Sequence, residues 1–487
     1  MSLSARPSEA AASPPWKLAG LVAGLIAFAA ILAAPDFGPG PLVRPVAAVT
    51  VLMAILWMTE AAPLMITALL PIVLFPALGV ADIRESAAPY ADPVIFLFLG
   101  GFVLGAAMER SGLHKRIGLG CAAAAGATPR RLVAGMLGAT ALVSMWVSNS
   151  AAAVLMMPVA MAVLALTEDH GAKDDPASHR NLAAALLLAV AYGASIGGMA
   201  TLIGTPPNAL LVGYMAREHG VEIGFVEWMA VGVPVSLALL AASWFVLTLS
   251  HPVRLTLPSA GDLFRTERER LGAMSGAETR VAVIFALAAG AWVFRPLLTP
   301  LAPWLTDTGI AIAAAVALAI VPAGRLNGER LVTGDELKRL PWEVLTLFGG
   351  GLSLAAAISD SGLAAWLGQL LGALDAWPVA LLVVLVTLAM IFLTELTSNT
   401  ASAATFLPIG GALALAIGAD PLVMAIPLAL AASCAFMLPV ATPPNAIVYG
   451  SGHITMGQMI RAGLWLNLIG VAVISLVVMT IGRAVFG

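Results

Sequence analysis

The sequence predicts an all-α, polytopic membrane protein with about 11 transmembrane helices and two re-entrant helical hairpins, arranged as inverted repeats. Three observations predict this fold: the composition, a long internal repeat, and two uncharged segments with a polar centre. Of the 487 residues, 60% are hydrophobic and 10% are charged, whereas soluble proteins carry about 25% charged residues. Uncharged runs such as 18–35 and 464–481 approach the roughly 20 residues that cross a bilayer core.

The composition also excludes other classes of protein. A soluble helical bundle needs polar outer faces, and a β-barrel would alternate apolar and polar residues instead of containing Ala/Leu blocks. The two cysteines lie in apolar stretches and the six histidines are scattered, so neither disulfides nor a metal cluster is expected, and no nucleic-acid partner. No signal cleavage site follows the N-terminus, so run 18–35 is expected to remain as the first helix.

The second observation is an internal repeat. Shifted by 250 positions, segment 98–118 matches 348–368, and Ser148-Asn149 falls on Ser398-Asn399. Further along, "GTPPNALLVGY" returns as "ATPPNAIVYGS", with a shorter offset of 237. Such repeats are typical of secondary transporters. The predicted organisation is therefore a first half at 1–250, a cytoplasmic linker at 251–280 and a second half at 281–487.

Basic residues predict the orientation, because cytoplasmic loops are rich in Lys and Arg. With a cytoplasmic N-terminus, all the basic residues fall on the cytoplasmic side except Arg44, Arg84, Arg217, Arg295 and Arg483. We therefore expect a multi-pass protein of the inner (plasma) membrane. The assignment requires each Ser-Asn segment to enter and leave the membrane on one side.

The third observation is the pair of segments "VSNSAAAVLMMP" at 147–158 and "TSNTASAATFLP" at 397–408. Each arm beside the first polar centre has about 16 residues, or roughly 25 Å of helix, which is short for a core of about 30 Å. We predict re-entrant hairpins at about 130–167 and about 376–417, entering from opposite faces with their tips near the midplane. The alternative is one long kinked helix per copy, which disturbs the charge asymmetry.

Two consecutive prolines interrupt a helix in each half, at "GTPPN" and "ATPPN". They remove two backbone donors and disfavour helix just upstream. We predict broken helices at about 182–218 and about 420–452, with carbonyls released near Gly204 and Ala441. A purely structural kink is the alternative. Its occurrence twice, each time with a matching hairpin, favours a binding site.

Helix ends at these breaks suit ions of both signs, because free N–H groups favour anions and free carbonyls favour cations. No Lys or Arg lies within 132–166, 182–216 or 376–460. A dianion held only by dipoles, hydroxyls and amides is costly to bury, and co-bound cations reduce that cost. Oxygen ligands without a carboxylate cluster favour Na⁺. The sequence thus indicates cation-coupled anion transport.

Two other functions are alternatives to symport. A sodium-independent exchanger on the same fold would favour a basic side chain beside the tips, and the sequence shows none there. A membrane enzyme would need a buried nucleophile–base pair, a carboxylate dyad or a metal cluster. The tips contain Ser without a His, Lys or Asp partner. We therefore expect a transporter and no enzyme.

The chain resembles the divalent anion/sodium symporter family, which includes dicarboxylate, citrate and sulfate transporters. The resemblance rests on segments spread over nearly the whole chain. It implies a homodimer with a scaffold part and a transport part that moves like an elevator, and at least two sodium sites framing one anion. The matching segments are "LWMTEAAPLMITALLP" (56–71), "SMWVSNSAAAVLMMP" (144–158), "GTPPNA" (204–209), "PWEVLTLFGGG" (341–351), "TELTSNTASAATFLP" (394–408) and "ATPPNA" (441–446).

The resemblance also implies site residues, carried over by position. The first sodium site would use Ser144, Ser148, Asn149 and the Gly204 carbonyl, and the second Thr394, Ser398, Asn399 and the Ala441 carbonyl. The anion would contact Asn149, Ser150, Thr205, Pro206, Ser398, Asn399, Thr400, Thr442 and Pro443.

One position departs from the family pattern. The third residue of both tips is usually Thr, and here the first tip has Ser150. The missing methyl leaves the identity of the dianion open. A C4-dicarboxylate such as succinate is the first choice, with sulfate or citrate next.

Three glutamates and three connecting segments complete the predictions. Glu395 is expected either to tune the second cation site or orient its hairpin, or to serve as an ordinary hydrogen-bonded contact with the scaffold. Glu60 and Glu343 are expected near the membrane interfaces, where they cap or anchor helices. Segments 109–127 and 359–375 are expected to be interfacial connectors or ordinary loops, and 262–280 a cytoplasmic loop with a short helix.

Overall fold

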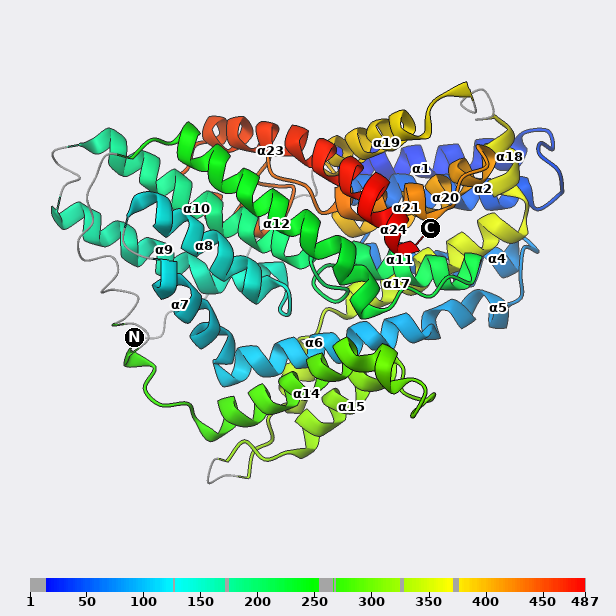
Figure 1. Cartoon of the computed structure of the whole chain (residues 1–487). Helices are drawn as coiled ribbons and strands as arrows, with labels where there is room; N and C mark the ends of the chain where they lie inside the picture. Colours follow the sequence, from blue (N-terminus) through cyan, green and yellow to red (C-terminus); the bar gives the residue numbers. More distant parts are fainter. Residues whose placement is uncertain are drawn as a thin grey trace, which may run out of the picture.

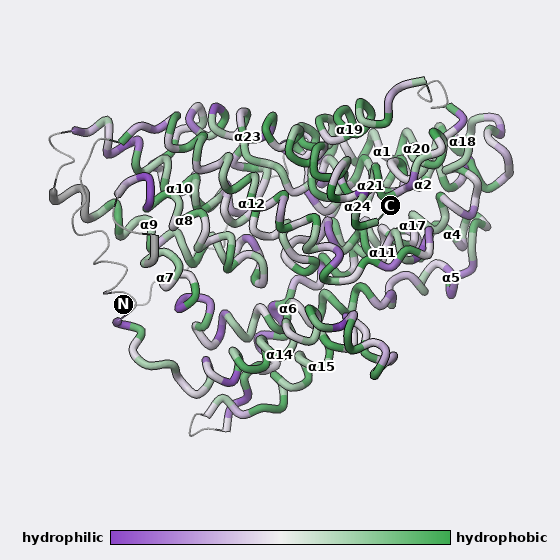
Figure 2. Tube along the Cα trace, in the orientation of Figure 1, coloured by the Kyte–Doolittle hydropathy of each residue, from purple (hydrophilic) through white to green (hydrophobic). Residues whose placement is uncertain are grey.

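The computed structural model describes residues 15–125, 128–170, 175–253, 266, 269–324, 328–370 and 376–486. Residues 254–265, 267 and 268 of the predicted linker lie outside this described part. Within it, helices are the regular structure, apart from one isolated bridge between Pro322 and Arg330. Figure 2 shows that hydrophobic residues run along most of these helices.

Seven described helices are long and apolar enough to cross a membrane, and shorter apolar helices accompany them. The predicted all-α polytopic fold is therefore confirmed. Several of the shorter apolar helices are the arms of the predicted hairpins or the pieces of the predicted broken helices.

The first half begins with helices that lead to a tight turn at Gly112. The α6 helix starts at Pro93 behind the N-cap Asp92, whose side chain accepts a hydrogen bond from Val94 N at 3.0 Å. It ends at Gly112 with φ +84°, and the matched Gly362 follows α17 (Trp342–Asp360) with φ +81°. Glycine enters this left-handed region without strain, so the turn itself is repeated. The helices are α1 (Pro15–Ala33), α2 (Val43–Thr59), α3 (Leu64–Ala68), α4 (Leu70–Ala77), α5 (Ile83–Ala87), η1 (Ala88–Ala91), α6 (Pro93–Ser111) and α7 (Leu113–Ala125).

The predicted first hairpin consists of two helices that pack against each other, with a break at 145–148. A helix that is interrupted by two prolines follows it. The elements are α8 (Pro129–Ser144), α9 (Asn149–His170), α10 (Pro176–Met199), α11 (Pro206–His219) and α12 (Phe225–Ser250).

The second half repeats this order. The 359–375 segment contains α18, as 109–127 contains α7, so both connectors carry a short helix. The elements are α14 (Gly276–Leu298), α15 (Asp307–Ile320), α16 (Gly334–Lys338), α17 (Trp342–Asp360), α18 (Leu363–Leu370), α19 (Val379–Thr394), α20 (Asn399–Ala416), α21 (Leu422–Ala432), α22 (Pro443–Tyr449), α23 (Met456–Val477), η3 (Val478–Gly482) and α24 (Arg483–Phe486).

Broken helices form the centre of the molecule. Every residue of α10 from Leu182 to Met199 is buried, because α8, α9, α12 and α22 surround it. The halves also exchange contacts: α11 of the first packs on hairpin helix α20 of the second, and α22 of the second packs on hairpin helix α9 of the first. Tyr192 strengthens this junction, since its hydroxyl donates to Phe436 O at 3.1 Å.

A second group of helices lies beside this centre. Figure 1 shows α6, α14 and α15 together along one side, and α15 packs closely on α6. Gly100 permits that approach, because an added Cβ would lie 2.6 Å from the backbone of Ala311. α17 joins the two groups, since it contacts α6 of the second group and packs on the central helices α11 and α20.

Candidate functional site

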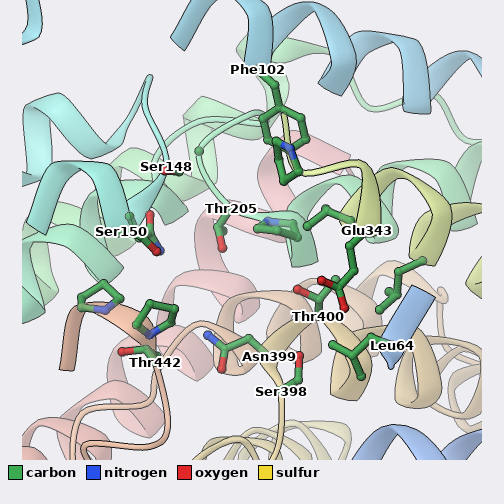
Figure 3. Close-up of a pocket in the computed structure, with 18 of the residues that line it drawn as sticks. Leu64, Phe102, Ser148, Ser150, Thr205, Glu343, Ser398, Asn399, Thr400 and Thr442 are labelled. Atoms are coloured by element: carbon green, nitrogen blue, oxygen red, sulfur yellow. The ribbon is translucent and has the colours of Figure 1, made fainter. Parts of the chain in front are cut away.

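A cavity of about 1460 Å³ lies where both hairpin tips and both proline breaks meet. Figure 3 shows side chains of the two tips and the two breaks around this space. Segments about 250 residues apart in the chain therefore face each other. Of the predicted site residues, those that line it are Ser148, Asn149, Ser150, Gly204, Thr205, Pro206, Ser398, Asn399, Thr400, Ala441, Thr442 and Pro443.

Each tip presents the start of a helix to the cavity. α9 begins at Asn149 and α20 at Asn399, and Ser148 and Ser398 are the residues before them. Ser148 Oγ accepts the Ala151 N–H at 3.3 Å, and Ser398 Oγ the Ala401 N–H at 3.5 Å. The preceding N–H groups of each helix have no acceptor among the described residues. They give each tip an anion-binding character, although neither tip contributes a cationic side chain to the cavity.

Behind each tip, three oxygen atoms share one proton. Ser144 Oγ lies 2.7 Å from Asn149 Oδ1 and 2.7 Å from the carbonyl oxygen of Ala194. A hydroxyl donates one hydrogen, so one of these close oxygen pairs lacks a proton between its atoms. Such an excess of lone pairs fits a hard cation.

The second tip has the same arrangement. Thr394 Oγ1 lies 2.6 Å from Asn399 Oδ1 and 2.9 Å from the Ala432 carbonyl oxygen. Ser144 and Thr394 are fully buried and do not line the cavity. They lie one layer deeper than the other predicted residues, between the tip and its broken helix.

An asparagine follows each proline pair and holds the loop that precedes it. Asn208 Nδ2 donates to Thr201 O at 2.8 Å, and Asn445 Nδ2 to Ala435 O and Leu438 O at 3.0 Å. Each asparagine thus fixes the loop that precedes its own helix. In the described part of the chain, no hydrogen bond reaches the carbonyls of Gly204 or Ala441, so both remain available to a ligand.

Gly198 lets the first break approach the first tip. A Cβ on Gly198 would lie 2.6 Å from Asn149 Oδ1 and 2.9 Å from Gly204 O, so these two oxygens converge on one point. The residues present therefore fit the pair of sodium ions that the family resemblance implies.

We expect Gly198→Ala to abolish sodium-dependent stabilisation of the protein at the first tip, because its methyl would occupy the convergence point of these oxygens. The measurement is the thermal unfolding temperature in NaCl and in choline chloride. Gly138→Ala is the matched control, since a Cβ there meets nothing within 4 Å on hairpin helix α8. An unchanged sodium response of Gly198→Ala would contradict the placement of a cation at this tip.

Glu395 connects the second hairpin to the second break. Its Oε1 accepts from the backbone N–H groups of Phe436 and Met437 at 2.7 and 2.8 Å, and from Asn467 Nδ2 at 2.7 Å. Its Oε2 accepts from Leu438 N at 3.0 Å. Of the roles considered for Glu395, these contacts match the orientation of the hairpin against the break. The repeat-related residue of the first half is Met145, whose carbonyl accepts from Thr201 Oγ1 at 2.5 Å.

Charged residues from other elements also line the large cavity. Lys17 pairs with Glu60 at 3.6 Å. Arg110 binds Glu329 at 3.0 Å and also binds Glu336. Burial raises the pKa of the Glu336 carboxyl, but hydrogen bonds from Thr333 and the charge of Arg110 outweigh this and hold the pKa below its ordinary value.

Glu343 belongs to the cavity, although the sequence placed it only near an interface. It stands in the first turn of α17, and Figure 3 shows its carboxylate pointing toward Thr400. Sequence reasoning also missed the carbonyls of Ala194 and Ala432, because a backbone oxygen inside a helix has no residue signature. The role of Asn208 and Asn445 had a visible signal, the Asn that follows both proline pairs.

Comparisons with known proteins place nearly the whole chain in one family of transporters. Residues 16–487 match the family model described as the sodium:sulfate symporter transmembrane region. The sodium-dependent dicarboxylate transporter SdcS of Staphylococcus saprophyticus is 40% identical over 485 residues, covering 97% of this chain and 92% of that protein. Its Staphylococcus aureus counterpart is 41% identical over 452 residues, covering 91% and 86%.

A solved structure shares the fold. The crystal structure of the Alcanivorax borkumensis YdaH transporter superposes with a TM-score of 0.58, covering 96% of this chain and 97% of that one. Only 16% of the residues are identical, so the likeness concerns the arrangement of the helices.

Proposed function

Since the chain belongs to the sodium:sulfate symporter family, we propose that it is a sodium-coupled symporter that imports a divalent anion, with a C4-dicarboxylate such as succinate as its substrate. Membership of a symporter family confirms the predicted family resemblance and the expectation that the chain is not an enzyme. The choice of a dicarboxylate is supported by the two staphylococcal relatives, which are named sodium-dependent dicarboxylate transporters.

One structural observation carries the proposal: each tip combines exposed helix N–H groups with a proton-deficient oxygen cluster behind them. The N–H groups suit carboxylates, and the oxygen clusters suit Na⁺. None of the residues contributed by the tips and breaks is charged. Two sodium ions, one at each tip, would balance the charge of a bound dianion.

The ligands follow from this arrangement. The first sodium ion is held by Ser144, Ser148, Asn149 and the Gly204 carbonyl, and the second by Thr394, Ser398, Asn399 and the Ala441 carbonyl. The dianion lies between the tips and contacts Asn149, Ser150, Thr205, Pro206, Ser398, Asn399, Thr400, Thr442 and Pro443. The symmetry of the two clusters supports two equivalent cation sites.

The transport cycle we propose is an elevator movement in the plasma membrane. The hairpins and broken helices move together, because they pack on one another around α10 and α21. The group that contains α6, α14 and α15 stays as a scaffold and provides the homodimer contact. The hairpins are re-entrant, enter from opposite faces, and the N-terminus is cytoplasmic.

Uptake of labelled succinate into proteoliposomes tests the function. We expect an inward sodium gradient to accelerate uptake at least about tenfold over choline, since without sodium the dianion meets an excess of unshielded oxygen atoms. Sulfate and citrate, added in excess, should compete weakly. Equal uptake in sodium and in choline would exclude coupling and favour exchange. If sulfate or citrate inhibits succinate uptake more strongly than unlabelled succinate does, that anion is the preferred substrate and the dicarboxylate assignment is wrong.

A further inference from the structure

Two asparagines, Asn208 and Asn445, are each the third residue of the helix that follows a proline break. Both are fully buried, and neither lines the large cavity. The amide oxygen of each has no donor among the described residues, and an unpaired buried polar atom is costly. The internal repeat nevertheless has asparagine at this place twice. The N–H groups of the side-chain amide are therefore the part of it that the fold uses.

The amide of Asn208 holds the loop between α10 and α11. Its Nδ2 donates to Thr201 O at 2.8 Å and to Gly198 O at 3.3 Å. The Thr201 carbonyl also accepts the Gly204 N–H at 3.4 Å. Through one shared carbonyl, Asn208 therefore holds the residue whose own carbonyl is proposed as a ligand of the first sodium ion.

The same loop returns to the last turn of α10, beside the first tip. A Cβ on Gly204 would lie 2.8 Å from Gly198 Cα. A Cβ on Gly198 would lie 2.9 Å from Gly204 O and 2.6 Å from Asn149 Oδ1. The carbonyl of Gly198 is thus held by Asn208, while its α-carbon faces the two oxygens of the cation cluster. A hard cation needs its oxygen ligands at defined distances, so a displaced loop weakens the site.

The second break has the same connection. Asn445 Nδ2 donates to Leu438 O at 3.0 Å, and the Leu438 carbonyl also accepts the Ala441 N–H at 3.2 Å. Here a carboxylate holds the loop as well, because Glu395 accepts the backbone N–H groups of residues 436–438. Hydrogen bonds to a charged group are roughly twice as strong as neutral ones.

The first loop has no such carboxylate. At the position of Glu395 the first half has Met145, whose carbonyl accepts the Thr201 hydroxyl. Trp228 Nε1 adds one further neutral hydrogen bond, to Met199 O at 3.0 Å. The first loop therefore depends more on its asparagine than the second loop does.

We propose that Asn208 is a positioning residue for the first sodium ion: its side-chain amide, through Thr201 and Gly198, sets where the Gly204 carbonyl oxygen lies. Asn445 acts in the same way on the loop that carries Ala441, where Glu395 shares the load. The proposal rests on the proposed function, which supplies the sodium ions. Loss of the amide weakens sodium binding more at the first break than at the second.

Binding of ²²Na⁺ to the purified full-length protein, in dianion-free buffer, tests this difference. Leucine has the branching of asparagine and no N–H group. We expect Asn208→Leu to bind one sodium ion at least about tenfold more weakly than wild type, and Asn445→Leu to weaken one ion by no more than about threefold. Asn181→Leu is the matched control, since it removes an amide that also donates to a backbone carbonyl, Pro252 O at 3.0 Å, away from the cavity.

Sodium-driven uptake separates positioning from a loss of folded protein. A positioning role raises the half-saturating sodium concentration and leaves the maximal uptake per folded chain close to that of wild type. A merely structural role lowers the maximal uptake and leaves the half-saturating concentration unchanged. Asn208→Ser keeps one hydroxyl donor, so it should weaken sodium binding less than Asn208→Leu, and it serves as the second variant if Asn208→Leu does not fold.

The outcomes distinguish this proposal from the proposed function. Wild-type sodium affinity in the folded Asn208 variants would overturn the positioning role and leave sodium coupling intact. An effect of Asn445→Leu as large as that of Asn208→Leu would contradict the inequality of the two breaks. A wild-type protein that binds no sodium would contradict the proposed function and this proposal together.

Discussion

Asn149→Ala and Asn399→Ala are each expected to reduce sodium-driven dianion uptake at least about a hundredfold, equivalent to roughly 3 kcal/mol, while the protein remains folded. Each asparagine places Oδ1 in the oxygen cluster behind its tip, 2.7 Å from Ser144 Oγ or 2.6 Å from Thr394 Oγ1. Each asparagine is also the first residue of the helix whose first N–H groups face the cavity. Alanine therefore removes a cation ligand next to the anion.

Both variants are measured in proteoliposomes, with succinate uptake and with ²²Na⁺ binding to the purified protein. Asn181→Ala is the control, because its amide bonds Pro252 O near the far end of α10 and does not line the cavity. The two variants should lose uptake to a similar degree, since the geometries of the two tips match. Wild-type uptake by either tip variant would contradict the assignment of that tip.

Glu395→Ala is expected to give the largest loss of folding stability, at least about 3 kcal/mol. It leaves the N–H groups of residues 436–438 and the Asn467 amide without their acceptor in a buried place. Each unsatisfied buried donor costs about 1–3 kcal/mol. The folding stability of Glu395→Gln should lie between those of wild type and Glu395→Ala, because the glutamine amide still offers one acceptor oxygen.

The unfolding temperature of the purified variants checks this prediction. Glu343→Ala is the control, because Glu343 is exposed and has no hydrogen bond or ion pair among the described residues. Uptake by Glu395→Gln provides a second measurement, since the second tip would lose its register with the 433–442 break. An unfolding temperature of Glu395→Ala equal to that of wild type would show that water satisfies these donors.

The sequence predicted those parts of the fold that have local causes. Two consecutive prolines remove two backbone donors and disfavour helix just upstream, so the breaks before 206–207 and 443–444 could be located without coordinates. The Ser-Asn tips could be recognised because polar residues are costly to bury inside long apolar segments and usually mark a functional site there. The repeat then indicated that the segments belong together.

Contacts between distant residues could not be predicted in the same way. Glu395 is an isolated acid in the sequence, and its three backbone partners lie 41–43 residues further on. The second oxygen near Ser144 is a backbone carbonyl of Ala194, 50 residues away. The pairing of Arg110 with Glu329 spans 219 residues and depends on how α6 meets the α15–α16 segment. Such partners are set by packing, and composition says nothing about them.

The exchange of contacts between the halves has a consequence for biosynthesis. Because α11 rests on α20 and α22 rests on α9, the second piece of each broken helix gains a packing partner only when the other half has been inserted. The ribosome delivers α20 about 180 residues after α11, and at about 5–20 residues per second the first half waits roughly 10–40 s for its partner. During that interval the ion pathway does not yet exist. The cavity between the two tips is therefore completed only late in synthesis, when the second hairpin has been inserted.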